Sequence, residues 1–142
     1  MRFMMLVKAN ADSEAGVLPS RELVAAMGRF NEEMIAAGVL LAADGLHPSS
    51  KGTRVRYSGK QRSVTDGPFP ETKELLAGFW VIQVKSREEA MQWALRIPFE
   101  EGEVEVRQVF EATDFPADIL PPEEAAREQD LRDRMQQNAG AR

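Results

Sequence analysis

Hydrophobic residues follow two spacings along this chain, one typical of strands and the other of helices. Residues 2–8 are apolar on both alternating faces, which favours a strand covered on two sides. After a loop at 9–18, residues 20–37 form a helical pattern that starts at Ser20 and is closed by glycine at 38. Its apolar positions, three or four residues apart, are Leu23, Met27, Phe30 and Met34. Residues 39–43 are a second two-sided apolar run, and therefore a second strand.

The middle of the chain predicts a hairpin followed by a long connection. Residues 53–57 and 61–65 flank Ser58-Gly59-Lys60, and a glycine between two short alternating runs indicates a tight turn. A strand is expected at 78–84. The stretch TDGPFPETKELLAGFW, residues 65–80, contains a connection of about a dozen residues between two strands, whereas a tight hairpin turn needs about two.

A second helix and a last strand follow. Ser86 and Glu89 have the spacing of a capping box, in which the serine hydroxyl accepts from the backbone of Glu89 and the glutamate returns the bond to the serine. This helix stops at Pro98. In the strand at 103–110, valines alternate with charged residues, so one face is apolar and the other is ionic.

These elements predict one α+β domain at residues 1–110, with the order strand–helix–strand, hairpin, strand–helix–strand. Residues 111–142 are an extension that holds a polar helix at about 122–137. Two helices cover one face of a single sheet. The other face is apolar enough to need cover, and a second copy of the chain is the simplest cover. We therefore expect a homodimer whose sheets face each other.

Composition limits the chemistry. The formal net charge of −5 argues against a nucleic-acid partner, which needs a basic face. No apolar run reaches the length of a membrane span, and the short N-terminal run fits a first strand better than a signal peptide, so we expect a cytoplasmic protein. The chain has no cysteine and one histidine, which excludes thiolate sites and metal sites built from several imidazoles. We expect neither a metal nor a cofactor.

The long connection is one candidate for ligand contact. Gly67 is expected to supply a backbone angle forbidden to other residues, and two prolines stiffen the loop. Asp66 can accept hydrogen bonds from the backbone of its own turn. Glu71 and Lys73 fall in what looks like one helical turn, where the lysine could meet an anionic ligand. A loop of this composition can also serve only to shape the chain or to form a dimer contact.

Other candidates lie elsewhere in the chain. Glu105 and Arg107 share the ionic face of the last strand, where they could line a polar cleft or form a plain salt bridge. His47, in the loop after the second strand, is the default general base, although a lone loop histidine also fits a solvated surface. Arg54 and Arg56 could present a guanidinium pair to a carboxylate or phosphate, or could form a solvated face.

Five segments together resemble the DGPF-domain proteins of the YCII-related family. They are DGPF at 66–69, ETKE at 71–74, GFW at 78–80, AMQWALRIP at 90–98 and EVEVR at 103–107. The similarity covers residues 2–110. It implies a ferredoxin-like fold that forms a dimeric α+β barrel, and it implies no particular reaction. It also suggests association with extracytoplasmic-function sigma factors, beside whose genes family members are often found.

An acid–base dyad proposed for the wider family does not carry over to this chain. That dyad joins a histidine near the first helix to an aspartate after the second strand. Here the first helix, 20–37, has no histidine, so Asp44 would have no partner.

Two functions therefore stay open. The first is a homodimer that binds a small polar or anionic molecule in a sheet cleft. Such a dimer could catalyse cofactor-independent proton transfer with His47 as base, Arg107 and Lys73 on an anionic group, and Glu105 or Asp66 as orienting groups. The alternative is a regulatory protein whose C-terminal helix docks on another protein, such as a sigma factor.

Overall fold

The computed structural model describes residues 1–140. Its contacts divide the chain into two units, one that ends at Val109 and one that starts at Phe110. Each unit is described by itself.

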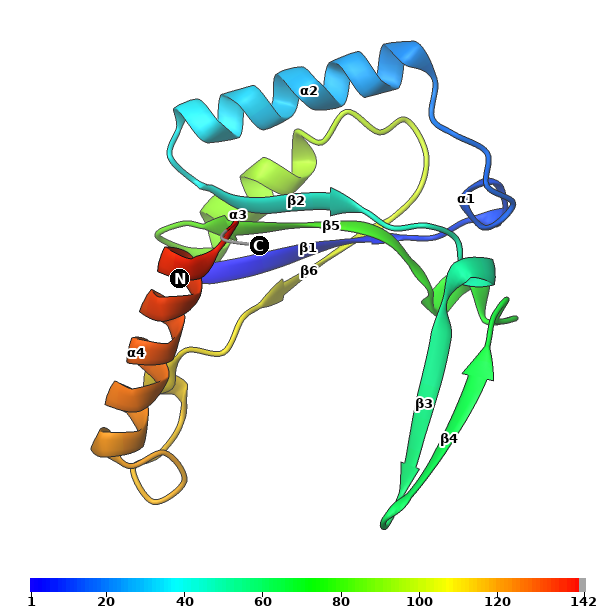
Figure 1. Ribbon diagram of the computed structural model, residues 1–142. Coiled ribbons are helices and arrows are strands. Elements are labelled where there is room, and N and C mark those ends of the chain that lie inside the picture. The colour runs from blue at the N-terminus through cyan, green and yellow to red at the C-terminus, as the bar shows by residue number, and fades with distance from the viewer. Residues whose placement is uncertain (141–142) are drawn as a thin grey trace. The chain divides into compact units, whose positions relative to one another are not determined.

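The first unit is built on a four-stranded sheet (Figure 1). Its strands are β1 (Arg2–Lys8), β2 (Leu40–Gly45), β5 (Leu76–Gln83) and β6 (Val104–Gln108). They lie in the order β2-β5-β1-β6, and each neighbouring pair is antiparallel. With the two helices that connect them, they confirm the predicted ferredoxin-like α+β fold with an inserted hairpin. Among residues 1–140 this sheet stays open and forms no closed barrel.

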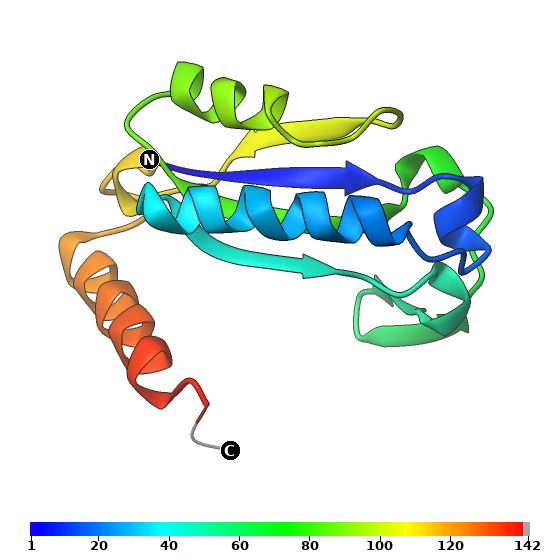
Figure 2. The ribbon, with the colours of Figure 1, turned by 90° about the horizontal axis from the view of Figure 1, so that it is seen from above.

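Both long helices of this unit cover the same face of the sheet (Figures 1 and 2). Helix α2 (Arg21–Ala36) lies over β1 and β2, and α3 (Arg87–Leu95) lies beside β6. The Ser20 hydroxyl caps α2 by accepting from the backbone N–H of Leu23, 3.1 Å away. Gly38 ends the helix with a φ of 74°, a left-handed conformation that favours glycine.

The start of α3 differs in one detail from the predicted capping box. The Ser86 hydroxyl accepts from the backbone N–H of Glu89 at 3.1 Å, as expected. The Glu89 carboxylate accepts instead from the backbone N–H of Lys85, at 2.8 Å. It therefore satisfies the donor one residue before the cap. A reciprocal box forms where a plain loop was predicted: Asn10 and Ser13 each accept from the other's backbone N–H, at 2.8 and 2.9 Å, and start the short helix α1 (Ala11–Glu14).

The core lies between the sheet and the two helices. Met5, Met34 and Ile82 are fully buried there. Aromatic rings join the layers, because Phe30 of α2 meets Trp80 of β5 edge-on, with ring centroids 5.8 Å apart. Asn31 Oδ1 accepts a hydrogen bond from the Trp80 indole N–H at 2.9 Å, so this buried ring has its polar atom satisfied.

The face of the sheet opposite the helices has no such cover from the first unit. Residues paired across antiparallel strands point to the same side of a sheet. Met4 pairs with Val81 and Arg107, and Leu6 pairs with Phe79 and Glu105. We call this surface the open face; it consists of Met4, Leu6, Phe79, Val81, Glu105 and Arg107. Its apolar side chains are half-buried, in contrast to the buried side chains on the helix-covered face.

The inserted hairpin forms a separate two-stranded sheet of β3 (Thr53–Ser58) and β4 (Gln61–Asp66). It projects from one end of the main sheet, on the side away from the helices (Figure 1). Every residue of both strands is exposed. Gly59 makes the turn with a φ of 59°. We refer to residues 53–66 as the hairpin arm.

The remaining elements are short helices in the connections and a helix in the second unit. The 3-10 helices are η1 (Ser49–Lys51), η2 (Thr72–Glu74) and η3 (Ala112–Asp114). Helix α4 (Pro122–Asn138) is the polar C-terminal helix that the sequence predicts, and none of its side chains is buried. Within residues 1–140, no helix combines the length and apolar character that a membrane span requires.

The Asn31–Trp80 hydrogen bond provides a test of the core. In Asn31→Leu the buried indole N–H loses its acceptor, so we expect the free energy of unfolding to fall by about 1–3 kcal/mol. Asn31→Asp keeps an acceptor oxygen at the same place and is the matched control. Urea unfolding followed by far-ultraviolet circular dichroism measures both, and equal stabilities of the two variants would contradict this role.

Candidate functional site

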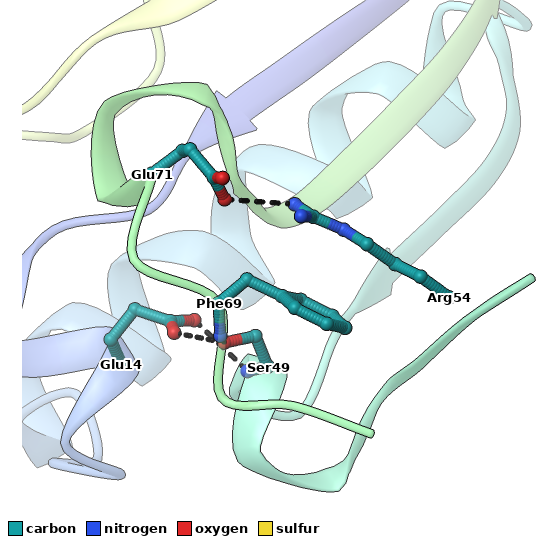
Figure 3. Close-up of polar contacts among 5 residues, drawn as sticks. All are labelled: Glu14, Ser49, Arg54, Phe69 and Glu71. Carbon is teal, nitrogen blue, oxygen red and sulfur yellow. Dashed lines mark hydrogen bonds and ion pairs between the residues drawn. The ribbon is translucent and has the colours of Figure 1, made fainter. Parts of the chain in front are cut away.

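Ser49 is the anchor of the long connection between β4 and β5 (Figure 3). Its backbone N–H and its hydroxyl donate to the two carboxylate oxygens of Glu14, at 3.0 and 2.5 Å. The Ser49 hydroxyl oxygen also accepts from the backbone N–H of Phe69, at 3.0 Å. One side chain thus links α1, η1 and the connection, three segments that are far apart in sequence. The connection is fixed to the domain at this point.

Gly67 serves a different purpose from the one predicted. Its φ lies outside the left-handed region, so it is not required for a special backbone angle. It is required for space, because a Cβ atom here would lie 1.8 Å from the carbonyl oxygen of Ser49. The backbone N–H of Gly67 also donates to the carbonyl of Gly52, at 2.9 Å. The loop and η1 approach so closely that no side chain fits between them.

Arg54 of β3 holds the next part of the loop. Its guanidinium carbon lies 3.8 Å from the centre of the Phe69 ring, and its Nη2 lies 3.2 Å from Glu71 Oε2. A hydrogen bond from the backbone of Glu71 itself, followed by the bond from Arg54, holds the pKa of the Glu71 carboxyl below its ordinary value. Glu71, a predicted ligand-binding residue, therefore already has an internal partner.

The predicted catalytic residues are not joined to each other. Asp66 Oδ1 accepts from the Thr53 hydroxyl at 3.0 Å, across the base of the hairpin arm, where a bond to its own turn was predicted. His47 is exposed, and among residues 1–140 it makes no hydrogen bond or ion pair with Asp66 or Glu71. Within the same part of the chain, no three histidine, aspartate or glutamate side chains cluster as metal ligands would.

Lys73 lies at a hollow of about 350 Å³ near the edge of the main sheet. The residues that line this hollow, which we call the lysine hollow, are Lys8, Ala9, Asn10, Lys73, Gly102 and Glu103. Backbone hydrogen bonds fix its walls, since Lys8 donates to the carbonyl of Glu103 at 3.0 Å and Ala9 donates to that of Leu75 at 2.8 Å. The ends of β1, β6 and the loop therefore meet here.

The predicted pair Glu105 and Arg107 lies next to this hollow, because Glu105 contacts Lys8, one of its lining residues. Glu105 Oε1 lies 3.6 Å from Lys8 Nζ, and Glu105 Oε2 lies 3.8 Å from Arg107 Nε. The side chains of Lys8, Glu105 and Arg107 are 21%, 44% and 73% exposed. In water such pairs contribute about 0–1 kcal/mol each. Three of the four predicted ligand-binding residues thus lie along one row of charges, whereas Glu71 is turned toward Arg54.

Sequence reasoning missed Lys8, Glu14 and Ser49. Lys8 ends an apolar strand, where a charged residue is ordinary. Glu14 and Ser49 are 35 residues apart, and neither belongs to a local pattern that would signal their hydrogen bonds. The nearest signal is the stiff composition of the loop. It indicates that the loop has a fixed position, but it does not identify the residues that bind it.

The close approach at Gly67 gives a sharp prediction. Gly67→Ala places a methyl group against a backbone carbonyl that cannot rotate away, so we expect a loss of about 1–3 kcal/mol in the free energy of unfolding. The matched control is Gly28→Ala in α2, where an added Cβ meets nothing within 4 Å and should stabilise by about 0.5–1 kcal/mol. Thermal unfolding of both variants checks the prediction, and a Gly67→Ala protein as stable as the wild type would refute it.

Comparison with known proteins identifies a family model and a relative that match this chain. The sequence model of the YCII-related domain matches residues 1–113. A protein of Rhizobium meliloti (strain 1021), itself described as uncharacterized, is 38% identical over 68 residues. That similarity covers 48% of this chain and 55% of the relative, so it spans about half the length of each. Since the domain model covers most of the chain, the protein belongs to the YCII-related family.

Proposed function

We propose that the protein acts as a homodimer, closed through the open faces of two sheets, that binds a small anionic molecule at the lysine hollow. One observation carries this proposal. Lys8 and Lys73, which are far apart in the sequence of the first unit, line the same hollow, and Lys8 is linked through Glu105 to the open face.

The open face supports the dimer. Four apolar side chains at its centre, Met4, Leu6, Phe79 and Val81, are only half-buried in one protomer. An antiparallel sheet that faces water on one side normally carries polar residues there. A two-fold axis would bring the same apolar patch of a second copy against this one. Glu105 and Arg107 would then be desolvated as a pair, which avoids the cost of burying either charge alone.

The lysine hollow supports the ligand. Among residues 1–140, the Lys73 side chain makes no hydrogen bond or ion pair, so its ammonium group is available to an anion. A lysine ammonium is a compact point charge with three donors, and it suits carboxylate and phosphate groups alike. Glu103, on another wall, can accept from a hydroxyl or amino group. A ligand with one anionic group and one hydrogen-bond donor matches both walls.

Catalysis is a further hypothesis beyond binding. Cofactor-independent proton transfer needs a base within hydrogen-bond reach of the ligand. His47 as base and Asp66 as its orienting group meet this requirement only if the bound state brings them together. The binding proposal does not depend on them.

The dimer is tested by mass. We expect multi-angle light scattering to give twice the 15.8 kDa of one chain for the wild type. Phe79→Asp puts a charge in the centre of the apolar patch and should give monomers, as should Val81→Lys. Ile35→Asp, at a 64% exposed position of α2 on the other side of the sheet, should stay dimeric. A monomeric wild type at micromolar concentration would refute the dimer.

The ligand is tested by thermal shift with a panel of small carboxylates and phosphate esters. A compound present at 100 times its dissociation constant should stabilise the protein by about 2.7 kcal/mol. Lys73→Gln should lose most of that shift. Lys60→Gln, in the turn of the hairpin arm, removes the same charge elsewhere and should keep it. If no compound stabilises the protein, or if both variants respond equally, the proposed site is wrong.

A further inference from the structure

The hairpin arm is basic in an acidic protein. Residues 53–66 carry Arg54, Arg56, Lys60 and Arg62 against the one acidic residue Asp66, while the whole chain has a net charge of −5. The arm is also fully exposed. Its charges therefore attract anions locally although the protein as a whole repels them.

Two of the arginines share one face of the arm. Arg54 and Arg56 are two residues apart on β3, so their side chains leave on the same side. Thr65 pairs with Arg54 across the hairpin, and Ser63 pairs with Arg56. Arg62 lies on the other face, paired with Tyr57, and its guanidinium carbon is 4.7 Å from the centre of the Tyr57 ring.

A hollow of about 400 Å³ lies at these arginines. It is lined by Arg54, Val55, Arg56, Tyr57, Thr65 and Phe69. This volume is within the range of about 300–1,000 Å³ that small-molecule sites occupy. On the face of Arg54 and Arg56 the lining combines two guanidinium groups and the Thr65 hydroxyl with the Phe69 ring, whereas the side chains of Val55 and Tyr57 leave on the other face of β3. We call it the arginine hollow, and it shares no residue with the lysine hollow.

The two arginines differ in what they already bind. Arg54 is held in place by the Phe69 ring and by the Glu71 carboxylate, 3.2 Å from its Nη2. The Arg56 side chain makes no hydrogen bond or ion pair with any residue between 1 and 140. Two guanidinium groups and one carboxylate leave a single positive charge. A monoanion would neutralise it.

We propose that the arginine hollow binds a small organic carboxylate, whose anionic group pairs with the free guanidinium of Arg56 and whose apolar body lies against the Phe69 ring. A carboxylate already pairs with an arginine of this face, since Glu71 Oε2 lies 3.2 Å from Arg54 Nη2. A planar carboxylate matches the two parallel N–H groups of a guanidinium. This binding site goes beyond the proposed function and does not require the dimer.

Benzoate is the probe, because it joins one carboxylate to an apolar ring. We expect saturable shifts of the Arg54 and Arg56 Nε–Hε signals in nuclear magnetic resonance spectra as benzoate is added to the wild-type protein. Arg56→Gln should weaken binding about tenfold or more, since it removes a charged hydrogen-bond donor pair. Arg56→Lys should also weaken it, because an ammonium lacks the planar fork.

The matched control is Arg62→Gln, which makes the same change on the other face of the same hairpin and should leave benzoate affinity unchanged. Glu71→Gln should strengthen binding, because it removes the carboxylate that occupies Arg54. Lys73→Gln should have no effect, and this separates the arginine hollow from the proposed function.

Three results would overturn the proposal. The first is equal benzoate affinity of the Arg56→Gln and Arg62→Gln variants. The second is a set of shifts that rise without saturation and are the same for benzoate and chloride, which would mean only general screening of charge. The third is tighter binding of inorganic phosphate than of benzoate, which would reject an organic carboxylate as the ligand.

Discussion

A four-stranded sheet has two faces, and the two long helices of the first unit lie on one of them. This imbalance determines much else in the molecule. On the covered side the chain places its largest side chains, including both tryptophans. On the open face it places Met4, Leu6, Phe79 and Val81 beside Glu105 and Arg107. The helices of the first unit bury the apolar side chains of the first face. The apolar side chains of the open face stay half-buried, and the proposed dimer would bury them.

The position of the loop between β4 and β5 depends on hydrogen bonds rather than on a hydrophobic core. Ser49 joins it to Glu14, and Gly67 lets the two backbones pass in contact. Such bonds each contribute only about 0.5–1.5 kcal/mol, but together they fix a segment that has few apolar residues. As a result two charged residues on one short segment face different neighbours: Lys73 faces the lysine hollow and Glu71 faces Arg54.

Periodicity in the sequence was enough to predict the strands and long helices of the first unit, because burial on one or two sides leaves a direct record in the order of apolar residues. The row of Lys73, Lys8, Glu105 and Arg107 was predicted in part, since an alternating strand such as 103–110 tells which residues share a face. The sequence could not reveal that Lys8 would meet Glu105. That contact depends on the register between β1 and β6, which no local pattern encodes.

Where the predictions failed, tertiary geometry decided between options that are locally equivalent. Glu89 can reach two neighbouring backbone donors, and the turn before α3 offers it Lys85. A glycine can be needed for an unusual backbone angle or for a close backbone contact. At position 67 the close approach to the Ser49 carbonyl shows that the contact is the reason. The pairing of Glu71 with Arg54 was not predicted, because nothing in the sequence shows that β3 would bring the arginine beside it.

The placement of the two indole rings has a practical consequence for optical work on this protein. Trp80 and Trp93 both contact Phe30 in the core under the helices. Their emission will therefore follow melting of that layer and will be insensitive to events at either hollow. The single tyrosine, Tyr57, sits under Arg62 on the hairpin arm, so a chromophore for the arm is already in place, while the lysine hollow would need an introduced label.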